Sequence, residues 1–155
     1  MPGTIVVGVD RSPYSEAALR FAADEAHLRG ADLVALHVWT YVSPAPVGEP
    51  TMMAMPAGDL PGLLEAERDA ADVELKAALE EAFVAKPPVE IEPRLVEGDA
   101  AEVLVAAAKD ADLVVVGSRG RGGLASALLG SVSSHVIHHA ACPVVVVKAP
   151  DTKGR

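Results

Sequence analysis

The chain has 155 residues, of which 50% are apolar and only 3% aromatic, so it is long enough to bury an aliphatic core in one domain. Its net charge of −9 argues against a nucleic-acid partner, because duplex binding requires a basic face that neutralises phosphates. Its single cysteine, Cys142, excludes an internal disulfide and a four-cysteine zinc site.

The sequence also bears on the membrane and the compartment. No apolar stretch approaches the length needed to span a bilayer. The first residues, MPGTIVVGVD, lack the basic segment and the small-residue cleavage site of a signal peptide. We therefore expect a cytoplasmic protein without a membrane partner.

The first two elements have clear boundaries. Residues 4–9 are apolar and β-branched, which is typical of a buried strand, and the turn-prone DRSP follows them. Ser12 before Pro13 predicts the start of a helix, with the hydroxyl as N-cap. Alanines at every fourth position share one face of this helix, and Gly30 ends it.

The rest of the chain continues the alternation of strands and helices. We expect further strands over residues 33–39, 89–96, 113–116 and 143–147, and further helices over 63–84, 100–109 and 131–140. Pro93 interrupts the third strand and predicts that it lies at a sheet edge, and Asp99 is the expected N-cap of the third helix. Residues 40–62 are rich in proline and methionine, have no period and are expected to form a mobile loop.

This order predicts an α/β fold, with an open five-stranded parallel sheet and helices on both faces. We see no repeat and no linker, so we expect one domain over residues 1–155, with its core over about 4–148 and a tail over 149–155. Ligands of such sheets bind beyond the carboxyl ends of the strands, where the strand order reverses. Two segments qualify, GVDRSP after the first strand and the glycine-rich GSRGRGGLASALLGS after the fourth.

The glycine-rich stretch is neither of two common phosphate loops. Gly122 is followed by another glycine and a leucine rather than by the lysine and hydroxyl residue of a Walker loop. Gly8 stands alone at the end of the first strand, so a G-x-G-x-x-G dinucleotide loop is absent as well. What remains is Gly117-x₂-Gly120-x₉-Gly130-Ser131.

That spacing has a physical logic. Gly117 and Gly120 allow the backbone to approach a ligand, and Gly130 with Ser131 opens a helix whose free N–H groups favour an anion. The hydroxyls of Ser131 and Ser133 add hydrogen-bond donors, and Arg119 and Arg121 supply positive charge. We expect Gly117→Asp or Gly130→Asp to abolish binding while the fold survives.

Each of these residues also has a plainer interpretation. The glycine stretch could be a flexible connector, Asp10 a turn residue, Ser12 chiefly a helix cap, and Arg121 solvated. Cys142 is expected to be a small buried side chain before the last strand, and Trp39 either stacks on a base or packs at the rim of the core.

Three histidines near the end of the fourth helix suggest a metal site. His135 and His139 are four residues apart and share a helix face, and His138 lies beside them. The position after the first histidine is Val136 rather than the glutamate of zinc proteases, and no other cluster in the sequence offers a third ligand to the pair on one face. We expect no metal here.

Three separated motifs, VGVD, the glycine pattern and the closing CPVVVV, occur here in the order typical of one family. From residue 5 to 147 the chain resembles the ATP-binding branch of the universal stress protein family. The resemblance implies the strand order 3-2-1-4-5 and a homodimer joined through the last strand. It also implies ATP as ligand, with or without Mg²⁺, and a role in the stress response.

The resemblance further implies residue roles. Asp10 would lie at the ribose and phosphate side with Val9 and Ser12, and Val38 would supply a backbone contact to adenine. The phosphates would be lined by the glycine stretch and the start of the next helix, through Gly117, Ser118, Arg119, Gly120, Gly130, Ser131, Val132 and Ser133. Arg11 departs from the small residue of many relatives, and it could hold phosphate or be solvated.

The leading hypothesis is a regulatory module that binds ATP and at most hydrolyses it slowly, because no nucleophile–base pair or carboxylate pair stands out. Three alternatives remain open: a binder of ADP, AMP or cyclic AMP, an ATP-dependent enzyme on the same fold, and a structural dimer with an unused loop. The sequence contains neither the H-I-G-H nor the S-G-G-x-D-S signature that ATP-dependent enzymes of related folds need, which counts against the enzyme alternative.

Overall fold

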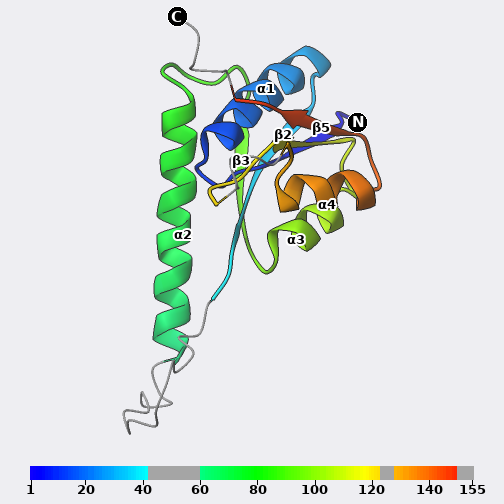
Figure 1. Cartoon of the computed structure of the whole chain (residues 1–155). Coiled ribbons are helices and arrows are strands. Elements are labelled where there is room, and N and C mark those ends of the chain that lie inside the picture. The colour runs from blue at the N-terminus through cyan, green and yellow to red at the C-terminus, as the bar shows by residue number, and fades with distance from the viewer. Residues whose placement is uncertain (42–59, 123–127, 150–155) are drawn as a thin grey trace, which may run out of the picture.

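The computed structural model of the chain describes residues 1–41, 60–122 and 128–149. In this part strands and helices alternate from the first element to the last (Figure 1). The elements are β1 (Thr4–Gly8), α1 (Pro13–Arg29), β2 (Asp32–Trp39), α2 (Leu60–Ala82), β3 (Ile91–Glu97), α3 (Ala100–Ala107), β4 (Leu113–Gly117), α4 (Ser131–His139) and β5 (Val144–Val147).

The five strands form one parallel sheet in the order β3-β2-β1-β4-β5, which confirms the predicted fold class and strand order. The order reverses between β1 and β4, which lie side by side in the middle of the sheet. Pro93 lies in β3, at one edge of the sheet, where a residue without an N–H is tolerated.

Helices cover both faces of the sheet, as predicted (Figure 1). Side chains of the central strands alternate between the faces, so Val7 and Val115 pack with α1 and α2 while Val6 and Val114 pack with α3 and α4. The central strands are buried on both sides, which explains their unbroken apolar runs.

Several predicted element boundaries agree with the observed ones and the others differ by one to three residues, and two of these differences have clear causes. The third helix ends at Ala107 rather than 109, because the N–H groups of Lys109 and Asp110 bond three residues back and tighten the last turn. The second helix begins at Leu60 rather than 63, because Pro61 is compatible with the first turn of a helix.

Helix α2 is long, and Figure 1 shows its N-terminal end reaching beyond the sheet. Its buried residues all lie between the midpoint of the helix and its C-terminal end: Ala71, Leu75, Ala78 and Ala82. The guanidinium Nε of Arg20 in α1 donates to the carbonyl of Ala82 at 2.6 Å and fixes the end of α2 against α1. No described helix is both long enough and apolar enough to cross a membrane.

Two predicted segments are only partly described. Residues 42–59 of the expected loop and residues 150–155 of the expected tail lie outside the described part. Residues 60–62, which we assigned to that loop, belong to α2.

Candidate functional site

A cleft of about 390 Å³ opens at the carboxyl ends of β1, β2 and β4, where the strand order reverses. Its volume is in the range of small-molecule sites. The wall is apolar on the side of the sheet and polar at the glycine-rich stretch, so the cleft offers two chemically different ends.

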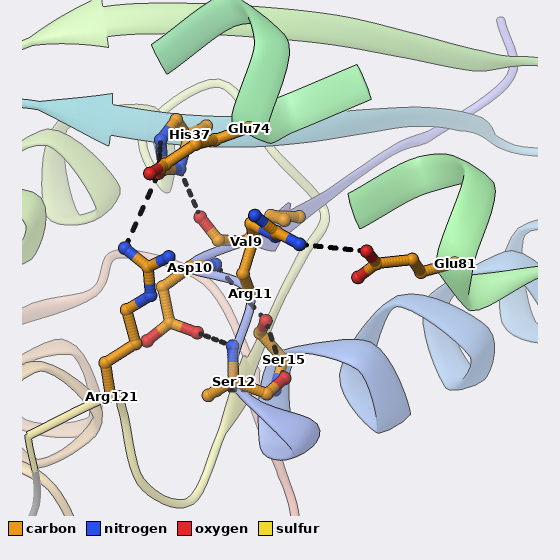
Figure 2. A network of polar contacts seen from close by, with 9 residues as sticks. All are labelled: Val9, Asp10, Arg11, Ser12, Ser15, His37, Glu74, Glu81 and Arg121. Carbon is orange, nitrogen blue, oxygen red and sulfur yellow. Dashed lines mark hydrogen bonds and ion pairs between the residues drawn. The ribbon is translucent and has the colours of Figure 1, made fainter. Parts of the chain in front are cut away.

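The turn after β1 places Asp10 at the cleft. Its Oδ1 accepts from the backbone N–H of Ser12 at 2.9 Å, while its own N–H donates to the hydroxyl of Ser15 at 3.2 Å (Figure 2). Asp10 is therefore held as a turn residue, and its second oxygen, Oδ2, lies toward Gly120. The turn interpretation and the ligand interpretation of Asp10 are compatible.

Ser12 is buried and caps α1, because its hydroxyl accepts from the N–H of Ser15 at 3.1 Å. It lies behind the turn and does not line the cleft, whereas Ser15 does. Our sequence analysis missed Ser15. Its position three residues before Ala18, on the buried face of α1, was the available signal.

Arg11 turns away from the cleft. Its backbone φ is 62°, an uncommon value for a residue other than glycine, and its Nη2 lies 2.8 Å from Glu81 Oε1 on α2 (Figure 2). Of the two roles that we left open for this cation, neither describes its position, because it forms an ion pair with α2.

The start of α4 lies at the other end of the cleft. Gly130 is the N-cap and supplies no side-chain acceptor, so no side chain of the described residues caps the first turn. Ser131, Val132 and Ser133 all line the cleft, and Ser131 is exposed. This turn presents unpaired N–H groups and the positive end of the helix dipole.

Two serines hold this helix start in place. The carbonyl of Ser118 accepts from the N–H of Gly130 at 2.7 Å and from the hydroxyl of Ser133 at 3.1 Å. Ser118 is buried and does not line the cleft, and the hydroxyl proton of Ser133 is used within the protein. Among the serines predicted here, Ser131 is the one whose side chain is exposed at the cleft.

The glycines of the stretch have different surroundings. A Cβ on Gly117 would lie 2.7 Å from backbone and side-chain carbons of Tyr14, so this glycine is required for packing against α1. A Cβ on Gly120 would meet only the carboxylate of Asp10, at 2.9 Å. Gly117→Asp therefore disturbs folding as well as binding and does not separate the two, contrary to our expectation from the sequence.

Both arginines of the stretch line the cleft. Arg119 is half-buried, and its guanidinium carbon lies 5.9 Å from the centre of the Tyr14 ring, within cation–π distance. Arg121 is half-exposed and lies 3.5 Å from Glu74 on α2, so it is ion-paired rather than only solvated.

The apolar end of the cleft consists mainly of residues that the sequence analysis did not single out. Val38, which was predicted, lies there with Val9 and four further residues, Leu36, Ala100, Leu104 and Val116. Val9 follows β1, and the other five lie on β2, α3 and β4, so only the fold brings them together. Trp39 does not line the cleft.

The histidines of α4 lie elsewhere. His135 Nε2 is 3.1 Å from Glu102 Oε1 on α3, and its ring centre is 4.3 Å from that of His139. His138 contacts the carbonyl of Ser134 at 2.7 Å. In the described ranges, no three histidine, cysteine or acidic residues are grouped so that they could hold a metal ion.

Comparison with known proteins identifies the family. The family model of the universal stress protein family matches residues 1–148. A universal stress protein of Mycolicibacterium smegmatis is 42% identical over 144 residues, which cover 93% of this chain and 45% of that protein. The chain thus spans about half the length of the curated relatives it matches.

Solved structures show the same fold. Universal stress protein UspA from Lactobacillus plantarum superposes with a TM-score of 0.71 at 26% identity, over 94% of this chain and 97% of that one. A universal stress protein in complex with cAMP superposes with a TM-score of 0.58 at 29% identity, over 96% and 98% of the two chains. The family model and the curated relatives match nearly the whole chain, and the sheet order and the position of the cleft agree with them. The chain belongs to the universal stress protein family.

Proposed function

We propose that the cleft binds an adenine nucleotide, ATP in particular, and that the protein is a regulatory module whose partners respond to the bound nucleotide. The observation that carries this proposal is the first turn of α4. It has no side-chain cap and faces the cleft, in which Arg119 and Arg121 supply positive charge. Phosphate groups satisfy the free N–H donors of such a turn.

The opposite end of the cleft suits a flat apolar base. Val38 and Leu36 of β2 and Val116 of β4 supply aliphatic surface, which a purine ring covers without leaving polar groups unpaired. The sugar would then lie between the two ends, beside Asp10. This carboxylate can accept from a ribose hydroxyl through Oδ2, because Oδ1 is already used in the turn.

Mg²⁺ fits the same position. It prefers oxygen ligands and is usually held by one or two carboxylates together with substrate phosphates. Asp10 is the only acidic residue among the described residues that line the cleft, and its Oδ2 has no hydrogen bond within the described structure. When bound with ATP, the ion would neutralise phosphate charge next to Asp10.

The lining also favours binding over rapid catalysis. The described lining residues include no histidine, cysteine or lysine, and the one carboxylate is held in a turn. A general base needs to reach the proton that it removes, and no second group is placed for that role in the described lining. Slow ATP hydrolysis remains compatible with this arrangement.

The test is calorimetric titration of the purified protein with ATP, with Ser131→Asp and Ser131→Asn as a matched pair. Aspartate in the first helical turn is favourable for the helix but places a negative charge beside the phosphates. We expect Ser131→Asp to weaken ATP binding at least about tenfold, with asparagine close to the parent. Equal affinity of the two variants, or a parent that binds no adenine nucleotide, would contradict the proposal.

A second candidate ligand is a nucleoside monophosphate such as cyclic AMP. It is favoured by the structure in complex with cAMP, which shares 29% identity with this chain. Parallel titrations with ATP, ADP, AMP and cyclic AMP distinguish the two candidates. If a monophosphate binds more tightly than ATP, the proposed ligand is the monophosphate rather than ATP, and the proposal of an adenine-nucleotide site stands.

We also propose a homodimer joined through β5. Among the described strands it pairs only with β4, and all four of its valines are half-buried, whereas Val114 and Val115 of β4 are fully buried. An edge strand with half-exposed apolar side chains can pair with another chain.

The single-domain organisation and the cytoplasmic localisation also stay predictions from the sequence.

A further inference from the structure

Helix α2 reaches the glycine-rich stretch through one carboxylate. Glu74 Oε2 lies 3.5 Å from Nη1 of Arg121 and 3.6 Å from Nε2 of His37 (Figure 2). Glu74 does not line the cleft, whereas Arg121 does. Arg121 therefore lines the cleft in which we place the phosphates, while its guanidinium is next to an acidic residue of α2.

His37 of β2 lies beside this carboxylate. Its side chain is only 8% exposed, and its Nδ1 lies 2.7 Å from the carbonyl of Val9, which can only accept, so Nδ1 carries the proton. The ring is therefore held against the turn that contains Asp10, with Nε2 toward Glu74 (Figure 2). The carboxylate of Glu74 therefore lies beside a ring that is bonded to the first loop of the cleft, while its other neighbour, Arg121, belongs to the second loop.

The pair between Arg121 and Glu74 is weak enough to exchange. Their side chains are 53% and 36% exposed, and the shortest separation of 3.5 Å is long for an ion pair. Such a pair contributes little to stability, because solvent screens both charges. By contrast, a hydrogen bond between a guanidinium and phosphate oxygens has charge on both sides and is stronger.

We propose that Arg121 determines specificity for a long phosphate chain, and that Glu74 is a positioning residue that competes with the ligand for its guanidinium. This inference rests on the proposed function and adds to it how ATP is distinguished from AMP. A triphosphate extends far enough from the sugar to draw Arg121 away from Glu74. A monophosphate ends at the start of α4 and leaves the pair intact.

Two single variants and their combination test the competition, with affinities for ATP and AMP measured by calorimetry. We expect Glu74→Gln to raise the affinity for ATP about two- to fivefold, because it releases Arg121 from a surface ion pair. We expect Arg121→Gln to lower the affinity for ATP about tenfold, because a charged donor to the phosphates is lost. The affinity for AMP should stay at the parent value in both variants.

The double variant separates competition from simple repulsion. If Glu74 acts through Arg121, Glu74→Gln has no further effect on ATP binding once Arg121 is replaced. If Glu74 only repels phosphate through space, Glu74→Gln tightens ATP binding equally with and without Arg121, and the proposal is wrong. A change of AMP affinity as large as that of ATP would also overturn it.

Glu81→Gln is the matched control. Glu81 lies on the same helix, seven residues later, and is likewise paired with an arginine, Arg11, at 2.8 Å, but neither member lines the cleft. It removes the same charge, so ATP affinity should stay at the parent value. Tightening equal to that of Glu74→Gln would assign the effect to net charge and overturn the proposal.

The failure of this inference is distinguishable from that of the proposed function. A parent protein that binds ATP with variants of unchanged selectivity contradicts only the role of Arg121 and Glu74. A parent that binds neither ATP nor AMP contradicts both. Thermal unfolding of each variant, expected near the parent value because all these side chains are partly exposed, confirms that the fold is intact.

Discussion

Gly117 and Gly122 differ in what a side chain would meet, although both belong to the same stretch. At Gly117 a Cβ would be 2.7 Å from carbons of Tyr14, whereas at Gly122 it would find no atom of the described residues within 4 Å. The first position lies where β4 meets the start of α1, and the second lies in an open turn. A glycine pattern therefore combines requirements of packing with requirements of binding.

We predict that Gly117→Ala lowers the free energy of unfolding by about 1–3 kcal/mol, because the added methyl group presses on the backbone of α1. Gly122→Ala is the control and should leave stability close to the parent value. Urea unfolding of the two variants measures the difference. Equal stabilities would show that α1 yields to the methyl group at little cost.

Cys142 allows a prediction on pH. It is half-buried just before β5, and desolvation raises the pKa of its thiol above the ordinary value. Since the thiolate is the reactive form, alkylation of the folded protein should need a higher pH than alkylation of an unstructured cysteine peptide. The measurement is the rate of iodoacetamide labelling against pH, and a midpoint at or below that of the peptide would be inconsistent with burial.

At the scale of elements, the helices differ in how they begin. Helix α1 is capped by Ser12 and α3 by Asp99, whose Oδ1 accepts from the N–H of Glu102 at 3.0 Å, whereas α4 begins at Gly130 without a side-chain acceptor. In α1 and in α3 a side chain of the protein accepts from one of the terminal N–H groups. Helix α4 has no such side-chain acceptor among the described residues and leaves these donors for a ligand, and that contrast supports the proposed phosphate position.

We predict that Ser12→Ala and Asp99→Ala each lower the free energy of unfolding by about 1 kcal/mol, because each removes an N-cap. Asp99→Ala should not change nucleotide affinity, because Asp99 does not line the cleft. Chemical denaturation and calorimetry on the same samples provide both values. A loss of affinity in Asp99→Ala would mean that the cap also holds Ala100, the first residue of α3, in place at the cleft.

At the scale of the whole molecule, the two edges of the sheet are unequal. Edge strand β3 carries Pro93 and several charged side chains, which disfavour pairing with another strand. Edge strand β5 consists of four half-buried valines. Further association through the sheet is therefore expected at β5.

We predict that the parent protein sediments as a dimer and that Val146→Lys sediments as a monomer. A lysine at a half-exposed edge can extend its ammonium into solvent in a monomer, but it would be buried between two paired chains. Sedimentation equilibrium measures the masses, and circular dichroism verifies the fold of the variant. A dimeric variant, or a monomeric parent, would rule out β5 as the interface.

The fold could be predicted closely because its signals are local. The apolar runs of the central strands, the Ser12–Pro13 helix start and the position of Pro93 each depend on residues adjacent in the chain, and all agree with the structure. Helix ends were less exact, as at Ala107, because the last hydrogen bonds can shift between i−4 and i−3 partners at little cost.

The sequence by itself determined the elements, their order and the parallel sheet, because periodicity, capping and β-branching act over a few residues. Only the tertiary structure decided where the charged side chains go: Arg11 pairs with Glu81, 70 positions away, and Arg121 with Glu74, 47 positions away. It also decided that Gly117 serves the packing of α1. Such contacts form between segments that the chain brings together only after it folds, so no local pattern specifies them.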